Sequence, residues 1–399
     1  MSDLHRPKKI HRTLVWGGWY GSRNIGDTAI LLGIRELYSQ INQGKHYYLR
    51  YLSTDPDYTN TNGVTGARAL LKSDILKPWN FIRLFNEFRT VDRVIISGGT
   101  PIFDFSHAIR SLYMRLPVLL GKPFILFGAG VKPINSSYGK RYIPSVLNKA
   151  RYVSVRDEGS YNILKGLGVN GVVKTADSAF FAPHSSREAL EEVLNRHKIK
   201  WDDKLLVVAP RLMSADKKRL YLDEDMGSDV VSETPKKMAD AIDAIADKFD
   251  KVVFMAMHYY GPDSDVELIK ETIGYTKSKN VMFLSEELRP DVGIALLKHA
   301  HLTFAMRLHA LLLSASMYTP MVGIAYETKV KDLFKRLKLE ENVVDLFDFD
   351  TEELTNTLLN ALKKRDQQHK HLEKRVTTLR ELVLKDARNV LKIDASYSD

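Results

Sequence analysis

Short apolar runs alternate with amphipathic stretches along almost the whole chain. In the first half the apolar runs are rich in β-branched residues, which is typical of strands buried on both faces of a parallel sheet. These runs are TLVW (13–16), YYLRYL (47–52), RVIIS (93–97), PFILFGAG (123–130), YVSVRD (152–157) and GVVKTAD (171–177). Between most of them, apolar residues recur with the helical period, as in 28–40 and 141–150. The pattern predicts alternating strands and helices, and therefore an α/β fold.

The alternation stops at a polar interval and then restarts. Residues 183–203 read PHSSREALEEVLNRHKIKWDD, a mostly helical connector. Strand patterns return at 204–211, 251–258, 280–287, 302–307 and 320–326, with helical patterns at 234–250, 264–278, 289–300 and 309–316. Two such blocks predict two Rossmann-like domains facing a central cleft.

The predicted boundaries follow these changes in pattern, and a length of 399 residues fits two domains. We assign residues 1–185 to an N-terminal Rossmann-like domain, 186–203 to a linker, 204–349 to a C-terminal Rossmann-like domain and 350–399 to a helical tail. In proteins with two Rossmann-like domains a final helix often crosses back to the first domain, and we expect the same of this tail.

Composition narrows the class of protein. The chain is 44% hydrophobic and 27% charged, as in ordinary globular proteins, and no stretch approaches eighteen consecutive apolar residues. The apolar run at 13–16 is too short for a signal peptide, so we expect a cytoplasmic protein. The chain has no cysteine, which excludes disulfides, zinc–thiolate sites and a cysteine nucleophile.

A net charge of +10 favours an acidic partner, such as nucleic acid, an anionic lipid surface or a phosphorylated substrate. The densest basic stretch, 362–375, also contains acidic residues, and a solvated helical face is the favoured interpretation of it. The sequence has no helix-turn-helix, zinc-finger or RNA-stacking motif. We therefore expect no nucleic-acid partner.

Glycines gather where strands of the first half end. The loop GGWYGSRNIGD (17–27) has four glycines, and a helix is predicted to begin near Asp27. Free amides at such a helix start attract phosphate or carboxylate. The loop matches neither the Walker A nor the G-x-G-x-x-G pattern, and a simple strand-to-helix turn with Asp27 as N-cap is the alternative. Further glycines at 98, 99, 128 and 130 predict a cleft floor lined by backbone.

Cationic residues follow the strands of the second half. Arg211, Arg307, His309 and Lys329 each come shortly after a predicted strand, so we expect them to converge at one edge of one sheet. Like charges repel by about 4 kcal/mol per pair at 4 Å with an effective dielectric near 20, so the cluster would need an anion. The alternative is that each arginine pairs with a local carboxylate. His258, with Asp263 and Asp265 nearby, is a weak set of metal ligands, and we expect no metal.

Seven motifs in this order resemble those of the polysaccharide pyruvyl transferase family. They are GSRNIGD (21–27), SGGTPIFD (97–104), GAGVKP (128–133), SVRDEGS (154–160), TADSAF (175–180), MRLHALLLSAS (306–316) and GIAYETKV (323–330). The resemblance implies a fold like that of GT-B glycosyltransferases, with two Rossmann-like domains. It also implies transfer of pyruvate from phosphoenolpyruvate to a glycan or lipid-linked oligosaccharide acceptor, with no metal or other cofactor.

The resemblance further implies roles for individual residues. Arg307, Leu308 and His309 match the family's phosphoenolpyruvate motif, Arg211 is the candidate for its second arginine, and Lys329 matches its lysine. We expect His309 to act as general acid. The first domain would face the acceptor, with candidate contacts at Asn24, Asp27, Gly99, Asp104, Arg156 and His258. A lipid-linked acceptor would place the enzyme against the inner membrane surface. The alternative function is a GT-B glycosyltransferase that uses a nucleotide-sugar donor.

Overall fold

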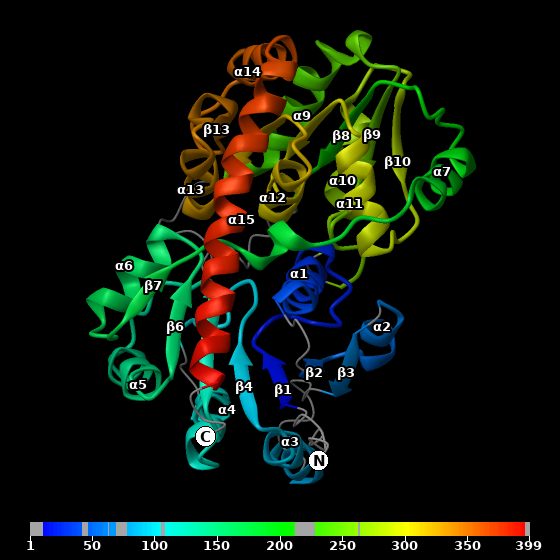
Figure 1. Ribbon diagram of the computed structural model, residues 1–399. Helices are drawn as coiled ribbons and strands as arrows, with labels where there is room; N and C mark the ends of the chain where they lie inside the picture. Colours follow the sequence, from blue (N-terminus) through cyan, green and yellow to red (C-terminus); the bar gives the residue numbers. More distant parts are fainter. Residues whose placement is uncertain are drawn as a thin grey trace. The chain divides into compact units, whose positions relative to one another are not determined.

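The computed structural model describes residues 11–41, 47–62, 64–68, 78–104, 108–211, 228–261 and 264–395 (Figure 1). They form two compact units, which are described one at a time. Unit 1 is Met1–Ala182 together with Leu379–Asp399, and unit 2 is Pro183–Thr378. Residues 186–203, which we expected to be a linker, belong to unit 2.

The described strands of unit 1 form one parallel sheet in the order β3-β2-β1-β4-β5-β6-β7. The strands are β1 (His11–Trp16), β2 (Tyr47–Ser53), β3 (Thr65–Arg68), β4 (Arg93–Ile96), β5 (Phe124–Ala129), β6 (Tyr152–Val155) and β7 (Val172–Lys174). The strand order reverses between β1 and β4. Open α/β sheets bind ligands at such a switch point, beyond the carboxyl ends of the strands.

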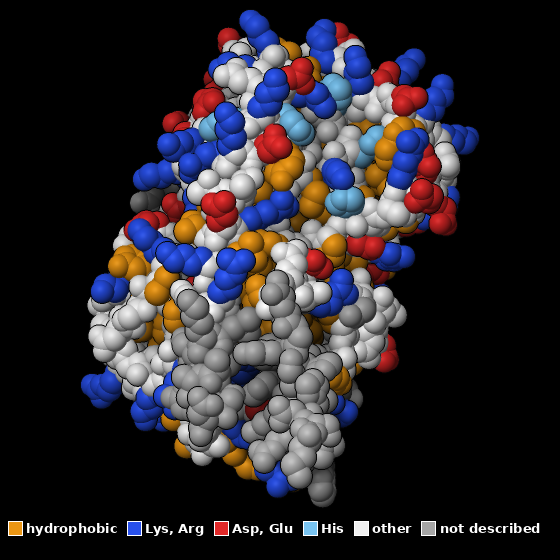
Figure 2. All heavy atoms as spheres, in the orientation of Figure 1, with side chains coloured by type: hydrophobic (Ala, Val, Ile, Leu, Met, Phe, Trp, Pro, Cys, Tyr) orange, Lys and Arg blue, Asp and Glu red, His pale blue; other side chains and the backbone are white. Residues whose placement is uncertain are grey.

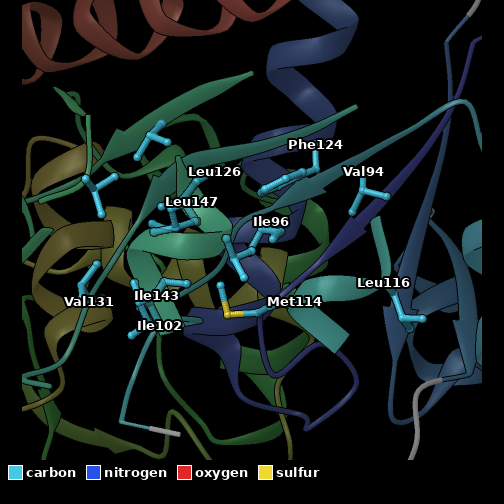
Figure 3. Close-up of a cluster of buried hydrophobic side chains, with 14 of the residues drawn as sticks. Val94, Ile96, Ile102, Met114, Leu116, Phe124, Leu126, Val131, Ile143 and Leu147 are labelled. Carbon is cyan, nitrogen blue, oxygen red and sulfur yellow. The ribbon is translucent and has the colours of Figure 1, made fainter. Parts of the chain in front are cut away.

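Helices and a large apolar cluster complete unit 1. The helices are α1 (Ile25–Ile41), α2 (Pro56–Thr61), α3 (Pro78–Arg89), α4 (Ala108–Leu119), α5 (Ser137–Leu147) and α6 (Glu158–Gly166), with a 3-10 turn η2 (Ser178–Phe181). Strands β4 and β5 contribute Ile96 and Leu126 to the core, where they pack with Met114 of α4 and Ile143 of α5 (Figure 3). Buried apolar contacts hold these helices against the sheet, and the loops at its carboxyl edge extend from these packed strands.

Unit 2 contains a second parallel sheet, in the order β10-β9-β8-β11-β12-β13 among the described residues. Its strands are β8 (Leu205–Ala209), β9 (Lys251–Met255), β10 (Val281–Leu284), β11 (Leu302–Ala305), β12 (Met321–Ala325) and β13 (Val343–Asp345). Every residue of β8, β11 and β12 is buried, as expected for strands covered on both faces. All strands predicted from the sequence are present, whereas the short edge strands β3 and β13 were not predicted.

The helices of unit 2 connect these strands. They are α7 (Arg187–Arg196), α9 (Ser228–Asp243), α10 (Val266–Tyr275), α11 (Pro290–His299), α12 (Leu308–Ser316), α13 (Thr328–Leu337) and α14 (Thr351–Lys363), with 3-10 turns η3 (Ala246–Lys248) and η4 (Glu340–Asn342). Together the two units confirm the predicted α/β fold with two Rossmann-like domains.

The long C-terminal helix α15 (Arg365–Ala395) contributes to both units. In unit 2, Gln368 accepts a hydrogen bond from Asn342. In unit 1, Arg380 donates to the carbonyl of Phe180, and Asp386 accepts hydrogen bonds from the hydroxyls of Tyr152 and Ser154 on β6 (Figure 1). Residues from 379 onward thus belong to the first domain, as expected for a tail that returns to it.

Charged side chains of both signs share the surface of unit 2. On the face that Figure 2 shows, Lys and Arg side chains are interleaved with Asp and Glu. No helix in the described part of the chain combines the length and the apolar character that crossing a bilayer requires.

Candidate active site

The sheet of unit 2 brings the predicted cationic residues to one edge. Strand β11 pairs with β8 on one side and with β12 on the other, and all three are parallel. Their carboxyl ends therefore lie side by side. Arg211 follows β8, Arg307 follows β11 and forms the N-cap of α12, and His309 and Lys329 lie in the first turns of α12 and α13. Helices α12 and α13 also pack against each other.

The hydroxyl of Tyr326, which follows β12 directly, links Arg211 to Glu327. Arg211 Nη1 donates to this hydroxyl at 2.5 Å, and its guanidinium lies 4.8 Å from the ring centroid. Burial raises the pKa of Tyr326 strongly, while the charges of Arg211 and Arg307 act in the opposite direction. The phenol stays neutral, and its hydroxyl donates to Glu327 at 2.8 Å. Arg211 is therefore held by an uncharged side chain that also contacts Glu327.

Arg307 forms a buried ion pair with Asp265. Its Nε donates to both carboxylate oxygens at 2.9 and 3.0 Å, and its Nη2 donates to Oδ1. The arginine is 8% exposed and the aspartate is fully buried. The two residues are 42 positions apart, so this partner is not the local carboxylate that the alternative interpretation assumed.

These contacts correct one expectation. We expected repulsion among the cations to make a bound anion necessary, but the protein itself supplies carboxylates at Asp265 and Glu327. Arg307 therefore needs no external anion to balance its charge. The cluster is a cationic site that the fold has already ordered.

Two helix N-termini add to the positive potential at this edge. The N-cap residues of α12 and α13 are Arg307 and Glu327, and neither side chain accepts a hydrogen bond from its own helix. The amides of a helix start carry partial positive charge and attract anions when no side chain caps them. The geometry of unit 2 therefore suits a small anion with several charges.

His258 lies at the end of β9 and holds Asp265 through its backbone. Its N–H donates to Asp265 Oδ2 at 3.1 Å, and its carbonyl accepts from the Asp265 amide at 2.9 Å. Asp263 lies outside the described residues. Among the residues that are described, no three His, Asp or Glu side chains are grouped as ligands of a metal ion. His258 thus contacts Asp265 through its backbone in unit 2, and its role as an acceptor contact stays a prediction.

In unit 1 the glycine-rich strand ends cross each other in direct contact. Gly98 has a φ of +140°, and a Cβ there would lie 2.5 Å from the backbone of Gly18. Gly17, at φ +115°, leaves only 2.9 Å between such a Cβ and the carbonyl oxygen of Ser97. The loops after β1 and β4 can approach this closely because glycines stand at the points of contact, and this explains why glycines gather there.

The start of α1 differs from the prediction. Asn24, and not Asp27, caps the helix, because its Oδ1 accepts from the amides of Gly26 and Asp27 at 2.9 and 3.3 Å. These amides are occupied and an acidic side chain follows them, so the expected attraction of phosphate or carboxylate is lost here. This edge suits an uncharged ligand with hydroxyl groups better than it suits an anion.

Three of the remaining predicted residues of unit 1 lie near one another. A Cβ on Gly99 would be 3.4 Å from Asp27 Oδ1, and a Cβ on Gly130 would be 2.3 Å from the carbonyl oxygen of Gly99 and 3.2 Å from Arg156 Nε. Arg156 is buried and forms an ion pair with Asp177, which follows β7. The structure therefore groups Asp27, Gly99 and Arg156.

Asp104 has a structural role in this geometry. Its Oδ2 accepts from the amides of Asn135 and Ser136 at 2.9 and 2.6 Å, and its Oδ1 accepts from the Ser136 hydroxyl. Partial burial opposes ionisation, but these hydrogen bonds outweigh it and lower the pKa of Asp104. A carboxylate stabilised in this way is a poor general base, which leaves Asp27 as the better candidate.

Sequence reasoning missed the roles of Asp265, Tyr326 and Asp177. Tyr326 and Asp177 do lie inside motifs that the sequence displays, GIAYETKV and TADSAF. Asp265 was noted only as a neighbour of His258. Its role depends on a contact between the ends of β9 and β11, and the spacing of residues along the chain carries no signal of that contact.

Comparison with solved structures identifies proteins of similar fold. UDP-GlcNAc 2-epimerase from Methanocaldococcus jannaschii matches with a TM-score of 0.58 and 11% identity, covering 89% of this chain and 92% of that one. The ADP-heptose lipopolysaccharide heptosyltransferase II of E. coli matches with a TM-score of 0.51 and 12% identity, covering 88% and 99%. These likenesses establish a GT-B-like fold and nothing further.

Comparison of sequences is more specific. The amylovoran biosynthesis protein AmsJ of Erwinia amylovora is 24% identical over 274 residues, which is 65% of this chain. The match spans 63% of the length of that relative. The family model for polysaccharide pyruvyl transferase matches residues 24–328, which include Arg211, Arg307 and His309 but not Lys329. The chain therefore belongs to the polysaccharide pyruvyl transferase family.

Proposed function

We propose that this protein transfers the pyruvyl unit of phosphoenolpyruvate to sugar hydroxyls of a cell-surface glycan or its precursor. The product is a ketal, and inorganic phosphate is released. Family membership supports the reaction class, and the similarity to an amylovoran biosynthesis protein supports a polysaccharide acceptor.

The observation that carries the proposal is the cationic edge of unit 2. Arg211, Arg307, His309 and Lys329 follow three adjacent strands, and two uncapped helix N-termini point to the same edge. Phosphoenolpyruvate bears about three negative charges near neutral pH, one on its carboxylate and the rest on its phosphate. Planar guanidinium groups bind both of these groups through paired hydrogen bonds.

In this mechanism each cationic residue has a separate task. Arg211 and Arg307 bind the carboxylate and phosphate, with Leu308 between Arg307 and the catalytic histidine, and Lys329 balances the remaining charge. His309 acts as general acid and protonates the methylene carbon. One sugar hydroxyl adds to the central carbon and gives up its proton, and a second hydroxyl then displaces phosphate and closes the ketal. No metal and no further cofactor take part in the proposed reaction.

The carboxyl edge of unit 1 supports a role in acceptor binding. Its loops are lined by backbone, the start of α1 is capped by Asn24, and the charge of Arg156 is balanced by Asp177. Such an edge offers hydrogen bonds without a strong positive field, which suits sugar hydroxyls. Asp27 is the candidate for accepting a proton from the attacking hydroxyl.

The net charge of +10 supports a place for the enzyme at an anionic membrane surface when the acceptor is lipid-linked. Each basic residue near such a surface contributes about 1 kcal/mol of attraction. Flotation with vesicles that contain anionic lipid tests this part of the proposal. Binding that is equal with neutral vesicles would contradict it.

A phosphate-release assay tests the main proposal. The purified protein is incubated with phosphoenolpyruvate and a panel of galactosides, mannosides and N-acetylmannosaminides, with UDP- and ADP-sugars as competing donors. We expect phosphate release that depends on the acceptor, together with an acceptor product whose mass has grown by a pyruvyl unit. Release of nucleotide from a sugar donor, without turnover of phosphoenolpyruvate, would favour the glycosyltransferase alternative.

A further inference from the structure

The carboxylate of Asp265 connects two strand ends of unit 2. Its Oδ2 accepts from the backbone amides of Met257 and His258, which follow β9, both at 3.1 Å. The same carboxylate receives the Nε and Nη2 of Arg307, which follows β11. Strand β8, which precedes Arg211, lies between these two strands. The contacts fix both the position and the plane of the Arg307 guanidinium.

The place of Asp265 in the chain makes these contacts unusual. It occupies the N-cap position of α10, where an aspartate normally accepts from the amides of its own helix. Here it makes no such bond. The first turn of α10 therefore has no side-chain cap from Asp265, and the Asp265 carboxylate binds Arg307 instead. Departures of this kind from a local preference are expected where function imposes them.

We propose that Asp265 is a positioning residue, which orients the Arg307 guanidinium for binding the anionic donor. This inference rests on the proposed function, because it takes phosphoenolpyruvate as that donor. Asp265 uses the Nε–Nη2 edge of Arg307, so the orientation of the whole planar group is set before substrate arrives. Preorganised donors of this kind bind an anion without having to be ordered first.

A purely electrostatic role for Asp265 makes the opposite prediction. If its charge only lowered the local positive potential, removing that charge would strengthen the binding of a trianion. If Asp265 positions Arg307, removing the carboxylate leaves the buried guanidinium without the negative charge that balanced it. The Arg307 side chain then turns away from its binding orientation. Loss of a partner that orients a binding group typically costs about 10- to 100-fold in affinity or activity.

The test is the substitution Asp265→Asn, which preserves shape and removes the charge. We expect the dissociation constant of phosphoenolpyruvate, measured by calorimetry, to rise about 10- to 100-fold, and KM to rise more than kcat falls. Glu267→Gln is the matched control, because Glu267 is an exposed carboxylate in the first turn of the same helix. Glu267→Gln should leave the dissociation constant, KM and kcat unchanged.

A double-mutant cycle with Arg307→Ala separates positioning from general damage. If Asp265 acts through Arg307, then Asp265→Asn has little further effect on the dissociation constant once Arg307 is replaced. An effect of the same size in both backgrounds would overturn the inference, as would unchanged or tighter binding in Asp265→Asn. Should that variant fail to fold, Arg307→Lys retains the ion pair but loses the fork, and its dissociation constant should rise to a similar extent. If the wild-type protein does not bind phosphoenolpyruvate, both the proposed function and this inference are overturned. If the wild-type protein binds phosphoenolpyruvate and Asp265→Asn binds it equally well, only the inference is overturned.

Discussion

The buried carboxyl of Asp386 makes the stability of unit 1 depend on pH in an unusual direction. Asp386 lies on α15 and accepts from the hydroxyls of Tyr152 and Ser154 at 2.6 and 2.7 Å. Burial raises its pKa from 3.8 to about 6, although these hydrogen bonds offset part of the increase. The perturbation we propose is Asp386→Asn, which removes the titrating group and keeps its shape.

The sign of the effect follows from proton linkage. Between about pH 4 and pH 6 the unfolded chain has lost the proton of Asp386 while the folded protein still holds it, so the free energy of unfolding falls as pH rises. The folded and unfolded pKa values of Asp386 differ by roughly two units, which corresponds to about 3 kcal/mol of stability. This contribution is fully lost above pH 6. The stability of wild type relative to Asp386→Asn should therefore fall by about 2 to 3 kcal/mol between pH 4 and pH 7.

Urea unfolding followed by tryptophan fluorescence measures this difference. Both proteins carry Trp201→Phe, which leaves tryptophans only in the sequence range of unit 1. Glu381→Gln, which removes an exposed carboxylate from the same helix, is the control and should show no such trend. A stability difference between wild type and Asp386→Asn that stays constant from pH 4 to pH 7 would refute the reasoning.

Three further predictions concern the site and its support. His309→Ala should lower kcat about 10²- to 10⁴-fold with an unchanged circular dichroism spectrum, and undiminished turnover would exclude His309 as the acid. Gly98→Ala should cost about 1 to 3 kcal/mol of stability, because the φ of +140° and the contact with Gly18 leave no room for a Cβ. Gly166→Ala is the control and should not destabilise the protein, because a Cβ added there would have no other atom within 4 Å. Leu126→Ala opens a cavity in the buried cluster of Figure 3 and should lower the free energy of urea unfolding by about 2 to 5 kcal/mol. A smaller loss would mean that neighbouring side chains move to fill the cavity.

The sequence determined the fold class and the edge of the sheet on which the cationic residues lie. Buried parallel strands must be apolar on both faces, so runs such as those of β8 and β12 are visible without any structure. The carboxyl ends of adjacent parallel strands meet at one edge, and for this reason Arg211, Arg307 and Lys329 could be placed together in advance. The edge strands β3 and β13, with the sequences TGAR and VVD, were not predicted, whereas β7, an edge strand that is also only three residues long, was.

Only the tertiary structure decided how the charges are arranged. Whether an arginine is compensated depends on which carboxylate the fold brings to it. Arg307 pairs with Asp265, 42 residues away, and Arg156 pairs with Asp177, 21 residues away, as well as with its neighbour Asp157. The sequence likewise could not show that Asn24 occupies the amides at the start of α1, because Asn24 and Asp27 are both good caps. Hydrophobic patterning is a local property of the chain, and the sequence reveals it directly. Compensation of charge depends on distances across the sheet, and these exist only once the chain has folded.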